Sequence, residues 1–250
     1  MDGQVEKEDW PLDETVVDGI SLEGGYYPHE NKLERKIGED KEMEFKYWSE
    51  RLRWREKVHG QYHDLWDLKL IRRGFPYVLN YLRDGERVLD IGAFRRHLEE
   101  RIKKQYPHVV YKSLDIDPTY PHDYSSFEEI EETFDIVFLF EVIEHLGLEE
   151  GREMVKNIFK ILSPGGRVIL STPNMHTPGQ YYKDITHLTP YYYEELGALF
   201  LSEGFEIVDI RRVFRESFLK FYLKGYILSR LFRFFGIDFS ESIILAARKG

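Results

Sequence analysis

The sequence predicts an α/β fold in which helices cover both faces of a mostly parallel, doubly wound sheet. Two observations carry this prediction. From Glu86 onward, short apolar runs alternate with segments of helical spacing, and this alternation is typical of parallel strands joined by crossover helices. The run FDIVFLF, which begins at residue 134, is nearly unbroken in its apolar character. Strands of that kind are buried on both faces, so helices are expected on both sides of the sheet.

Taken in order, these runs define the expected elements. The expected strands are 87–92, 109–116, a strand starting at 134, 164–174, 206–213 and 242–249. The expected helices are 97–106, 149–163 and 191–205, and the serines and acids of 125–132 suit the start of another. Gly165 and Gly166 predict the turn that leads into the strand after them. The last two strands can pair antiparallel if 214–236 lies outside the sheet.

Composition divides the chain into an extension and a core domain. The first sixty or so residues are rich in charge, Trp and Tyr, and they lack the dense Val, Ile and Leu runs that follow. Because 45–82 also reads as helices, we expect residues 1–84 to form a helical, partly irregular N-terminal extension that either covers the active site as a lid or caps the sheet. Residues 85–250 then form the α/β domain, with an aromatic and basic insertion at 214–236.

Several classes of protein are disfavoured by composition. No stretch approaches the roughly 20 apolar residues that span a bilayer, and the start MDGQVEKEDW lacks a signal-peptide pattern, so a cytoplasmic location is expected. The chain has no cysteine, which excludes disulfides and cysteine-ligated zinc. Its net charge of −10 argues against indiscriminate binding to nucleic acid backbones and leaves a local basic groove open, so nucleic acid is not the expected partner.

Polar residues follow the expected strands at the edge where ligands bind in open α/β sheets, outside the carboxyl ends of the strands. They are Asp90, Gly92, Asp115, Asp117, Glu141, Glu144, His145, Thr172 and Asn174. A carboxylate at the end of the second strand can accept hydrogen bonds from both ribose hydroxyls. Asp115 lies 25 residues after Asp90, compared with about 20 in dinucleotide-binding folds. The sequence therefore points to a nucleoside-bearing cofactor.

Five motifs occur in a fixed order: VLDIG, LDIDP, FDIVFLFEVIEHL, LSPGGRVILSTPN and HLTPYYYEELGALFLSEGF. In this order, the sequence from about 86 to 250 resembles the Rossmann-like class I S-adenosylmethionine-dependent methyltransferases, and most of all the branch with the ubiquinone-biosynthesis O-methyltransferases. The resemblance implies S-adenosyl-L-methionine as the cofactor. It also implies methyl transfer to an oxygen or nitrogen atom of a small organic substrate.

The resemblance also assigns roles to residues of this chain. Asp90, Gly92 and Ala93 would line the methionine part of the cofactor, although a structural role for Asp90, capping nearby backbone amides, is an equal alternative. Asp115 would bind the ribose, Ile116 would lie against the adenine, and Asp123 would reach the adenine amino group. The residues expected to face the transferred methyl group are Phe140 and Glu141. His145 or His187 would act as the general base that takes a proton from the acceptor, beside Glu141.

The sequence departs from the family at two places. The first loop usually carries three alternating glycines, but here only Gly92 remains, and Phe94 and Arg96 occupy the other two positions. Their side chains could obstruct the cofactor, or Arg95 or Arg96 could pair with its carboxylate. The sixteen positions between Asp117 and Phe134 are too few for the usual helix and strand, so one edge of the sheet is expected to be truncated. A noncatalytic module that has lost the cofactor is therefore an alternative.

A second enzymatic alternative concerns Glu141, Glu144, His145 and His187. The first three have the i, i+3, i+4 spacing that shares one face of a helical turn, and two carboxylates with two imidazoles suit Mg²⁺ or Mn²⁺. The set resembles the metal site of the small-RNA 3′-terminal 2′-O-methyltransferases. This alternative implies metal-assisted methylation of an RNA 3′ end.

The insertion 214–236 combines large apolar residues with lysines and arginines. At 100° per residue the basic residues do not share one side, and Gly225 favours a break. Peripheral membrane contact through this segment is one hypothesis. Packing against the core or against a dimer partner is the other.

Overall fold

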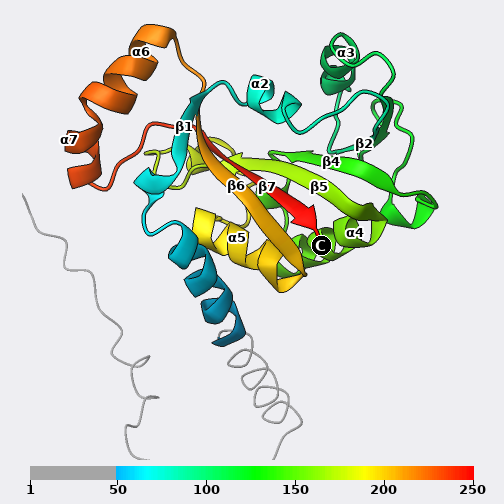
Figure 1. The fold of residues 1–250 in the computed structure, drawn as a ribbon, viewed down its shortest axis with the longest axis horizontal. Helices are drawn as coiled ribbons and strands as arrows, with labels where there is room; N and C mark the ends of the chain where they lie inside the picture. The colour runs from blue at the N-terminus through cyan, green and yellow to red at the C-terminus, as the bar shows by residue number, and fades with distance from the viewer. Residues whose placement is uncertain (1–48) are drawn as a thin grey trace, which may run out of the picture. The chain divides into compact units, whose positions relative to one another are not determined.

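The computed structural model describes residues 49–250, which belong to one compact unit, residues 47–250 (Figure 1). The part of the expected N-terminal extension before residue 49 lies outside the described residues. Among the described residues, no helix combines the length and the apolar character that a crossing of the lipid bilayer requires.

A seven-stranded sheet runs through the unit in the order β1-β6-β7-β5-β4-β2-β3. Its neighbouring strands are parallel except at β7, which is antiparallel to both β5 and β6. The strands are β1 (Lys69–Arg72), β2 (Arg87–Ile91), β3 (Val110–Leu114), β4 (Phe134–Phe140), β5 (Leu162–Pro173), β6 (Phe205–Phe214) and β7 (Ser242–Lys249). This topology confirms the expected Rossmann-like sheet with its antiparallel last strand.

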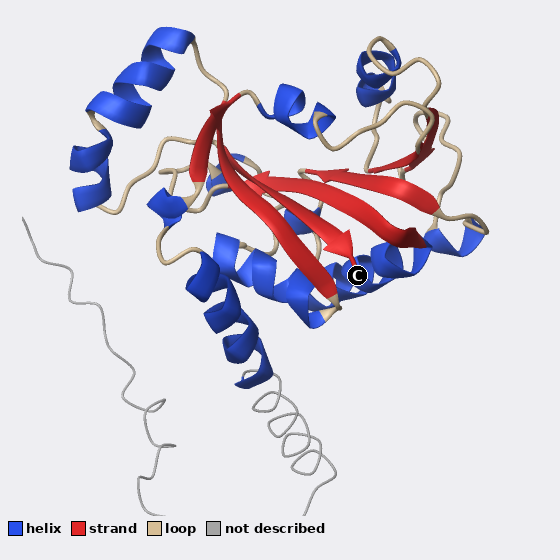
Figure 2. Ribbon diagram, in the orientation of Figure 1, coloured by secondary structure: helices blue, strands red, loops and turns tan. Residues whose placement is uncertain are grey.

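Helices cover both faces of this sheet. Figure 1 shows α2 and α3 on one face and α4 and α5 on the other, and Figure 2 shows the same layers by type of structure. The helices are α2 (Gly74–Leu79), α3 (His97–Lys103), α4 (Leu148–Ile161) and α5 (Tyr193–Ser202). Residues 49–61 are also helical and pack on α5, where a Cβ at Gly197 would lie 2.8 Å from Val58. Short 3-10 turns are η2 (Leu65–Asp67), η3 (Phe127–Glu129), η4 (Ile143–His145) and η5 (Tyr181–Lys183).

The core lies in two layers because strand side chains alternate between the faces of the sheet. Val137 and Leu139 of β4 belong to the cluster under α4 and α5. Ile136 and Phe138 belong to the cluster under α2 and α3. All four side chains are fully buried, which explains why the sequence of β4 is apolar without alternation.

The expected truncation of one sheet edge is present at β3. Between Leu114 and Phe134 the described chain contains the turn η3 and a single bridge from Leu114 to Tyr124. The helix expected to start within 125–132 is only this turn. Ser125 donates from its backbone and its hydroxyl to the carboxylate of Glu129, so the local polar groups close a loop instead of starting a longer helix.

The opposite edge corrects the expected domain boundary. Residues 69–72, assigned from the sequence to a helical extension, form strand β1 parallel to β6. Leu70 and Ile71 pair in register with Arg212 and Val213 of β6. The sheet domain therefore begins before residue 85. A lid role for the remaining extension stays a prediction.

The insertion between β6 and β7 is helical. It contains α6 (Phe218–Tyr222), the π-helix η6 (Leu223–Ile227) and α7 (Ser229–Phe234). Figure 1 shows these helices beside the β1 edge, outside the sheet. With this segment outside the sheet, β6 and β7 pair antiparallel as expected.

Candidate active site

The loop after β2 keeps the backbone of a glycine-rich turn although two of its glycines are missing. Gly92, Phe94 and Arg96 all have positive φ angles, of 73°, 44° and 56°. This region disfavours side chains by about 1–2 kcal/mol per residue. At Gly92 a Cβ would also lie 2.3 Å from Val142, so only glycine fits there. The alternating left-handed pattern predicted by the family's glycines is therefore preserved.

The side chains of Phe94 and Arg96 lie away from the turn itself. The Phe94 ring is 51% exposed and meets Tyr120 edge-on, with 5.3 Å between the ring centroids. The Arg96 guanidinium bonds to Glu99 at 2.9 Å and to Asp123 at 3.1 Å. Because both acids belong to the protein, Arg96 is already paired, and Arg95 donates to the Tyr120 hydroxyl at 2.8 Å.

Asp115 lies directly beside this loop. Its two carboxylate oxygens accept the backbone N–H groups of Phe94, at 2.8 Å, and of Asp117, at 3.0 Å. Since an ionised carboxylate has about four acceptor positions, further donors such as ribose hydroxyls can still bind. The next residue, Ile116, is 87% exposed. The tips of β2 and β3 thus present an acid and an apolar side chain side by side.

Asp90 is an interior residue. Its carboxyl group is 5% exposed and accepts a hydrogen bond of 2.5 Å from the Tyr111 hydroxyl of β3. Burial raises the pKa of Asp90 to about 7, against the lowering effect of the Tyr111 hydrogen bond. Ala93 is also buried. The buried hydrogen bond to Tyr111 fits a structural role for Asp90. Its contact with the cofactor stays a prediction.

Asp123 is occupied by protein partners. It accepts the backbone N–H of Ser113 at 2.9 Å and forms ion pairs with Arg96 and Lys112. Although burial acts in the opposite direction, these hydrogen bonds and charges together lower the pKa of Asp123. Its carboxylate ties the loop after β3 to the loop after β2, and its predicted role toward adenine stays a prediction.

The end of β4 separates two acids that the sequence analysis placed on one helical face. Glu141 has a positive φ of 54° and lies before the turn η4. Its carboxylate accepts hydrogen bonds from Ser171, at 2.7 Å, and from Arg215, at 3.1 Å. Glu144 and His145 lie within η4 instead. The expectation of a shared face for all three is therefore wrong. Glu141 itself has the left-handed backbone conformation, which directs its side chain toward Ser171 of β5 and Arg215 after β6.

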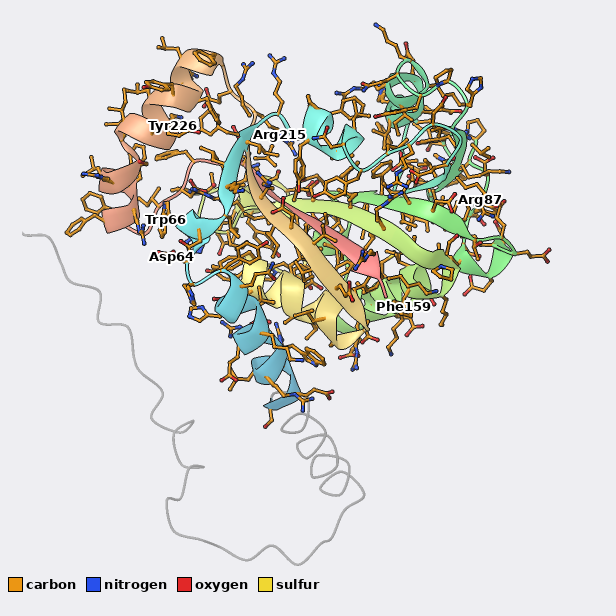
Figure 3. All side chains as sticks on the ribbon, viewed as in Figure 1. Asp64, Trp66, Arg87, Phe159, Arg215 and Tyr226 are labelled. Carbon is orange, nitrogen blue, oxygen red and sulfur yellow. The ribbon has the colours of Figure 1, made fainter. Side chains whose placement is uncertain are left out.

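Glu141 lines a cavity of about 480 Å³ between α2, α3 and the carboxyl ends of the strands. Its polar lining consists of Arg73, Arg101, Glu141, Ser171 and Arg215, and its apolar lining includes Phe75, Val78, Leu98, Phe140, Val213 and Ile244. This volume lies within the usual range for small-molecule sites, about 300–1,000 Å³. Arg215 lies where β6 passes into the insertion (Figure 3).

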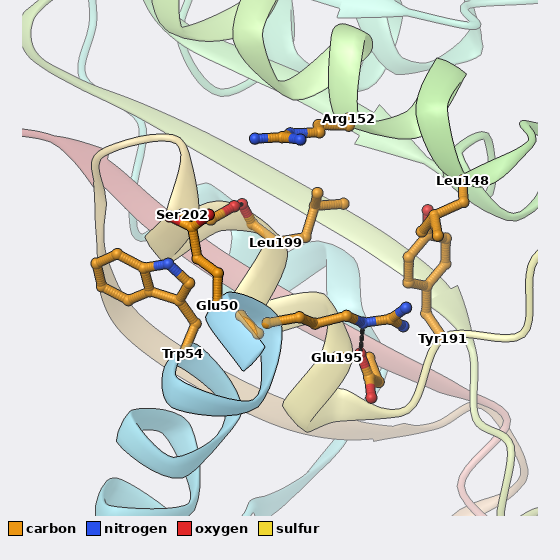
Figure 4. Close-up of a pocket in the computed structure, with 10 residues that line it drawn as sticks. Glu50, Trp54, Leu148, Arg152, Tyr191, Glu195, Leu199 and Ser202 are labelled. Carbon is orange, nitrogen blue, oxygen red and sulfur yellow. Dashed lines mark hydrogen bonds and ion pairs between the residues drawn. The ribbon is translucent and has the colours of Figure 1, made fainter. Parts of the chain in front are cut away.

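A second hollow, of about 30 Å³, lies between the 49–61 helix, α4 and α5 (Figure 4). Arg51 forms an ion pair with Glu195 there, and Trp54, Arg152 and Tyr191 also line it. It has room for only one or two water molecules. This hollow is therefore too small to hold a nucleoside or a methyl acceptor.

On the α4 side of the strand ends, the loop after β5 folds back onto η4. The backbone oxygen of Glu144 accepts the N–H groups of Leu188, at 2.8 Å, and of Thr189, at 3.0 Å. These bonds bring the His187 ring to 4.7 Å from the His145 ring, centroid to centroid. The predicted meeting of His187 with the end of β4 is thus present.

Hydrogen bonds at Nδ1 set the orientation of both imidazoles. His187 Nδ1 lies 2.6 Å from the carbonyl of Tyr181, an acceptor, so the nitrogen carries the proton. Thr186 donates its hydroxyl proton to Asp184, so His145 Nδ1 donates to Thr186 at 2.8 Å. In the neutral rings, this leaves the Nε2 lone pairs of His145 and His187 available for a proton or a metal ion.

Glu144 completes this cluster. Its side chain is fully buried, and neither carboxyl oxygen has a hydrogen-bond partner of good geometry among the described residues. Burial, helped by the negative charge of Glu141, raises the pKa of Glu144 to about 8, against the lowering effect of its own backbone N–H and of the Thr172 hydroxyl nearby. Ligand atoms of Glu144, His145 and His187 lie within 4.8 Å of one another. An orphaned buried carboxyl beside two oriented imidazoles fits a divalent metal ion, and Glu141 is not part of the set.

Comparison with known proteins agrees with this architecture. Residues 43–210 match a family described as a methyltransferase domain. The chain belongs to this methyltransferase family. A 90-residue stretch is 39% identical to a probable S-adenosylmethionine-dependent methyltransferase of Mycolicibacterium smegmatis, covering 33% of each protein. The chain thus spans about a third of the length of this curated relative.

Solved structures show the methyltransferase fold. A SAM-dependent methyltransferase from Archaeoglobus fulgidus is similar, with a TM-score of 0.55 and 18% identity over 78% of this chain and 94% of that one. The [4+2]-cyclase SpnF is similar, with a TM-score of 0.51 and 16% identity over 70% and 78%. At these identities the likeness shows the fold alone, and the reaction must be argued from the site.

Three arginines that line the cavity beside Glu141, namely Arg73, Arg101 and Arg215, were not predicted from the sequence. Arg73 follows β1 directly, so identifying that strand would have placed it at the ligand-binding edge. Arg101 lies on the predicted α3 helix, but without the position of α2 nothing marked it as lining a cavity. Of the predicted residues, the structure joins Asp115 with the loop at Gly92 and His145 with His187. It places Glu141 apart from both pairs.

Proposed function

We propose that this protein transfers a methyl group from S-adenosyl-L-methionine to an oxygen or nitrogen atom of a small organic substrate. The observation that carries the proposal is the loop after β2, where Phe94 and Arg96 are held in backbone conformations that suit glycine. Such conformations persist only where the surrounding structure demands them, and they are common at binding sites. The membership of the methyltransferase family supports the same reaction.

The residues for this cofactor fit its chemistry. The exposed Gly92 and the neighbouring Ala93 would line the methionine part, Asp115 would accept hydrogen bonds from the ribose, and Ile116 would offer an apolar surface to the adenine. The bound sulfonium supplies an electrophilic methyl group. The protein then needs chiefly to orient the acceptor and to exclude water.

The acceptor would occupy the cavity beside Phe140 and Glu141. Arg215 and Ser171 fix the Glu141 carboxylate at its wall. Arg73 and Arg101 have no carboxylate partner among the described residues, and they favour an acceptor that carries a negative charge. Neither His145 nor His187 lines this cavity, so their role as the general base, with Nε2 available, requires an acceptor that extends from the cavity toward η4. A cytoplasmic location for this reaction stays part of the proposal.

Calorimetric titration with S-adenosylhomocysteine tests the cofactor assignment. We expect saturable binding by the full chain and at least a tenfold loss of affinity in Asp115→Ala. Asp117→Ala is the matched control, because Asp117 is exposed on the same loop and its side chain bonds Thr119. Absence of binding at millimolar ligand would defeat the proposal and favour a noncatalytic module.

The orphaned Glu144 carboxyl favours a second candidate, metal-assisted methylation of the terminal ribose of an RNA. Glu144, His145 and His187 would hold the Mg²⁺ or Mn²⁺ ion, whose charge would lower the pKa of a ribose hydroxyl. Methyl transfer to an RNA 3′ end should then stop on addition of a chelator and resume with Mn²⁺. Transfer that continues in the chelator would count against this candidate.

A further inference from the structure

The insertion between β6 and β7 exposes an unusual amount of apolar surface. Half of the large apolar side chains that are exposed among the described residues lie between 218 and 235, and their exposed fractions range from 42% to 83%. They are Phe218, Leu219, Tyr222, Leu223, Tyr226, Ile227, Leu231, Phe234 and Phe235. Such concentration is typical of an interaction surface. We call these nine residues the apolar stripe.

Exposed positions repeat every four residues: 218 and 219, 222 and 223, 226 and 227, 230 and 231, 234 and 235. Nine of these ten positions form the stripe, and the tenth is Arg230. In a regular α-helix a four-residue step turns about 40° beyond a full circle, so such a pattern would wind around the axis. Here the middle is the π-helix η6, and Leu228 N–H bonds Leu223 O, an i to i+5 bond. The wider turn offsets this rotation. The exposed apolar residues can therefore lie on one side of the insertion, although the basic residues do not share one side at 100° per residue.

The opposite side of the same helices is anchored on the protein. Phe221 lies 5.7 Å from Phe214, and Phe232 lies 4.4 Å from Phe239, between ring centroids. A Cβ at Gly225 would lie 2.6 Å from Leu70 of β1. Because this inward side is packed against the sheet domain, the exposed side chains of the stripe face outward.

The charge of the insertion indicates whether the stripe binds a second copy of the chain or a lipid surface. Residues 214–236 contain five cations and one acid. Four of the cations form ion pairs with Glu141, Glu216 or Asp64, which leaves Arg230 as the cation without such a pair among the described residues. The exposed Arg230 lies within the stripe's own repeat, beside Leu231. In a twofold dimer that buried the stripe against itself, the same patch would meet its copy and bring like charges together. An anionic lipid surface instead attracts Arg230 and accepts the apolar side chains.

We propose that the apolar stripe binds the surface of an anionic lipid bilayer. The aromatic and aliphatic side chains enter the boundary between headgroups and acyl chains, while Arg230, which forms no ion pair among the described residues, meets the headgroups. The helices lie in the interface and do not cross it. The inference is independent of the proposed methyl transfer.

Sedimentation with vesicles tests this proposal on the full chain. We expect binding to vesicles of phosphatidylcholine with an equal part of phosphatidylglycerol, weaker binding to phosphatidylcholine alone, and a decrease with added salt. Phe234→Ser/Phe235→Ser should lower the partition coefficient about tenfold or more. Val208→Ser is the control, because Val208 is 46% exposed on β6, outside the stripe. Thermal unfolding of each variant verifies folding.

Three outcomes would overturn the proposal. The first is no binding to the anionic vesicles. The second is equal loss in the double variant and the control, or no loss in either. The third is a concentration-dependent dimer, seen by light scattering, that the double variant abolishes while vesicles are not bound; this result would assign the stripe to a second copy of the chain.

Discussion

The two acidic regions at the carboxyl edge of the sheet differ in how their carboxyl groups are satisfied. On the β2–β3 side, Asp90, Asp115 and Asp123 each accept hydrogen bonds from the protein. On the β4–β5 side, Glu144 is buried with no well-placed partner among the described residues. Each carboxyl group of the first region has a hydrogen-bond donor in the folded protein, and Asp115 and Asp123 hold the backbone of the neighbouring loops in place. The second needs a proton or a ligand to offset the cost of burying its carboxyl group.

This contrast suggests a division of labour. Asp115 and Asp123 fix the loops around the proposed cofactor through backbone N–H groups, so a ligand there meets a preformed surface. Glu144, His145 and His187 bring their ligand atoms within 4.8 Å of one another. Such clusters of titratable groups are typical of catalytic and metal-binding sites. Each half of this comparison can be tested by changing one group.

The largest effect is expected at Asp90. Its folded pKa of about 7 exceeds the unfolded value of about 3.9, so the native state holds an extra proton between these two pH values. Stability should therefore fall as pH rises from about 4 to about 7, by up to about 1.4 kcal/mol per unit, or about 4 kcal/mol in all. Asp90→Asn cannot titrate, and chemical denaturation across this range should show a flatter profile. Equal slopes in both proteins would show that Asp90 is ionised in the folded state.

Gly92→Ala sharpens the same side of the comparison. The new Cβ meets Val142 at 2.3 Å and the φ is 73°, so strain and overpacking together should cost about 2–4 kcal/mol of unfolding free energy. Gly85→Ala is the control, since φ there is 85° but nothing lies within 4 Å, and it should cost only about 1–2 kcal/mol. Similar losses in the two variants would mean that Val142 moves aside freely.

Sequence patterns could predict β2 to β7 because burial on both faces leaves a signal in each apolar run. They missed β1, whose four residues lie at the sheet edge with no more than two apolar side chains. They could also predict His145 with His187, but not the separation of Glu141 from Glu144. That separation depends on the left-handed backbone conformation of Glu141. Because this position is not a glycine, no sequence pattern predicts that conformation. The stripe was missed because a π-helix changes the period on which helical faces are judged.

For the β4–β5 side, Mn²⁺ titration asks whether Glu144 is a ligand. Removing one of three protein ligands should weaken binding about 100-fold, or about 2.7 kcal/mol, so Glu144→Gln should nearly abolish the calorimetric signal. Glu149→Gln is the matched control, an exposed acid at the start of α4. If the two variants bind Mn²⁺ alike, the buried carboxyl is satisfied by its proton and the cluster serves as a base.

The smallest effect is expected at Phe94, and it tests whether the loop is strained as folded. Phe94→Gly removes the Cβ at a φ of 44°, which relieves about 1–2 kcal/mol, while the added freedom of the unfolded chain returns about 0.5–1 kcal/mol. Because the edge-on contact with Tyr120, worth about 0.5–1.5 kcal/mol, is also lost, these effects nearly cancel, and the free energy of unfolding in urea should change by less than about 1 kcal/mol. Phe94→Ala loses the same contact with Tyr120 but keeps the strain, so it should be less stable than Phe94→Gly. If alanine proves the more stable of the two, the backbone relaxes at this position. Only Gly92 and Arg96 would then hold the left-handed conformations of the turn, and the proposed cofactor loop would be less rigid at Phe94.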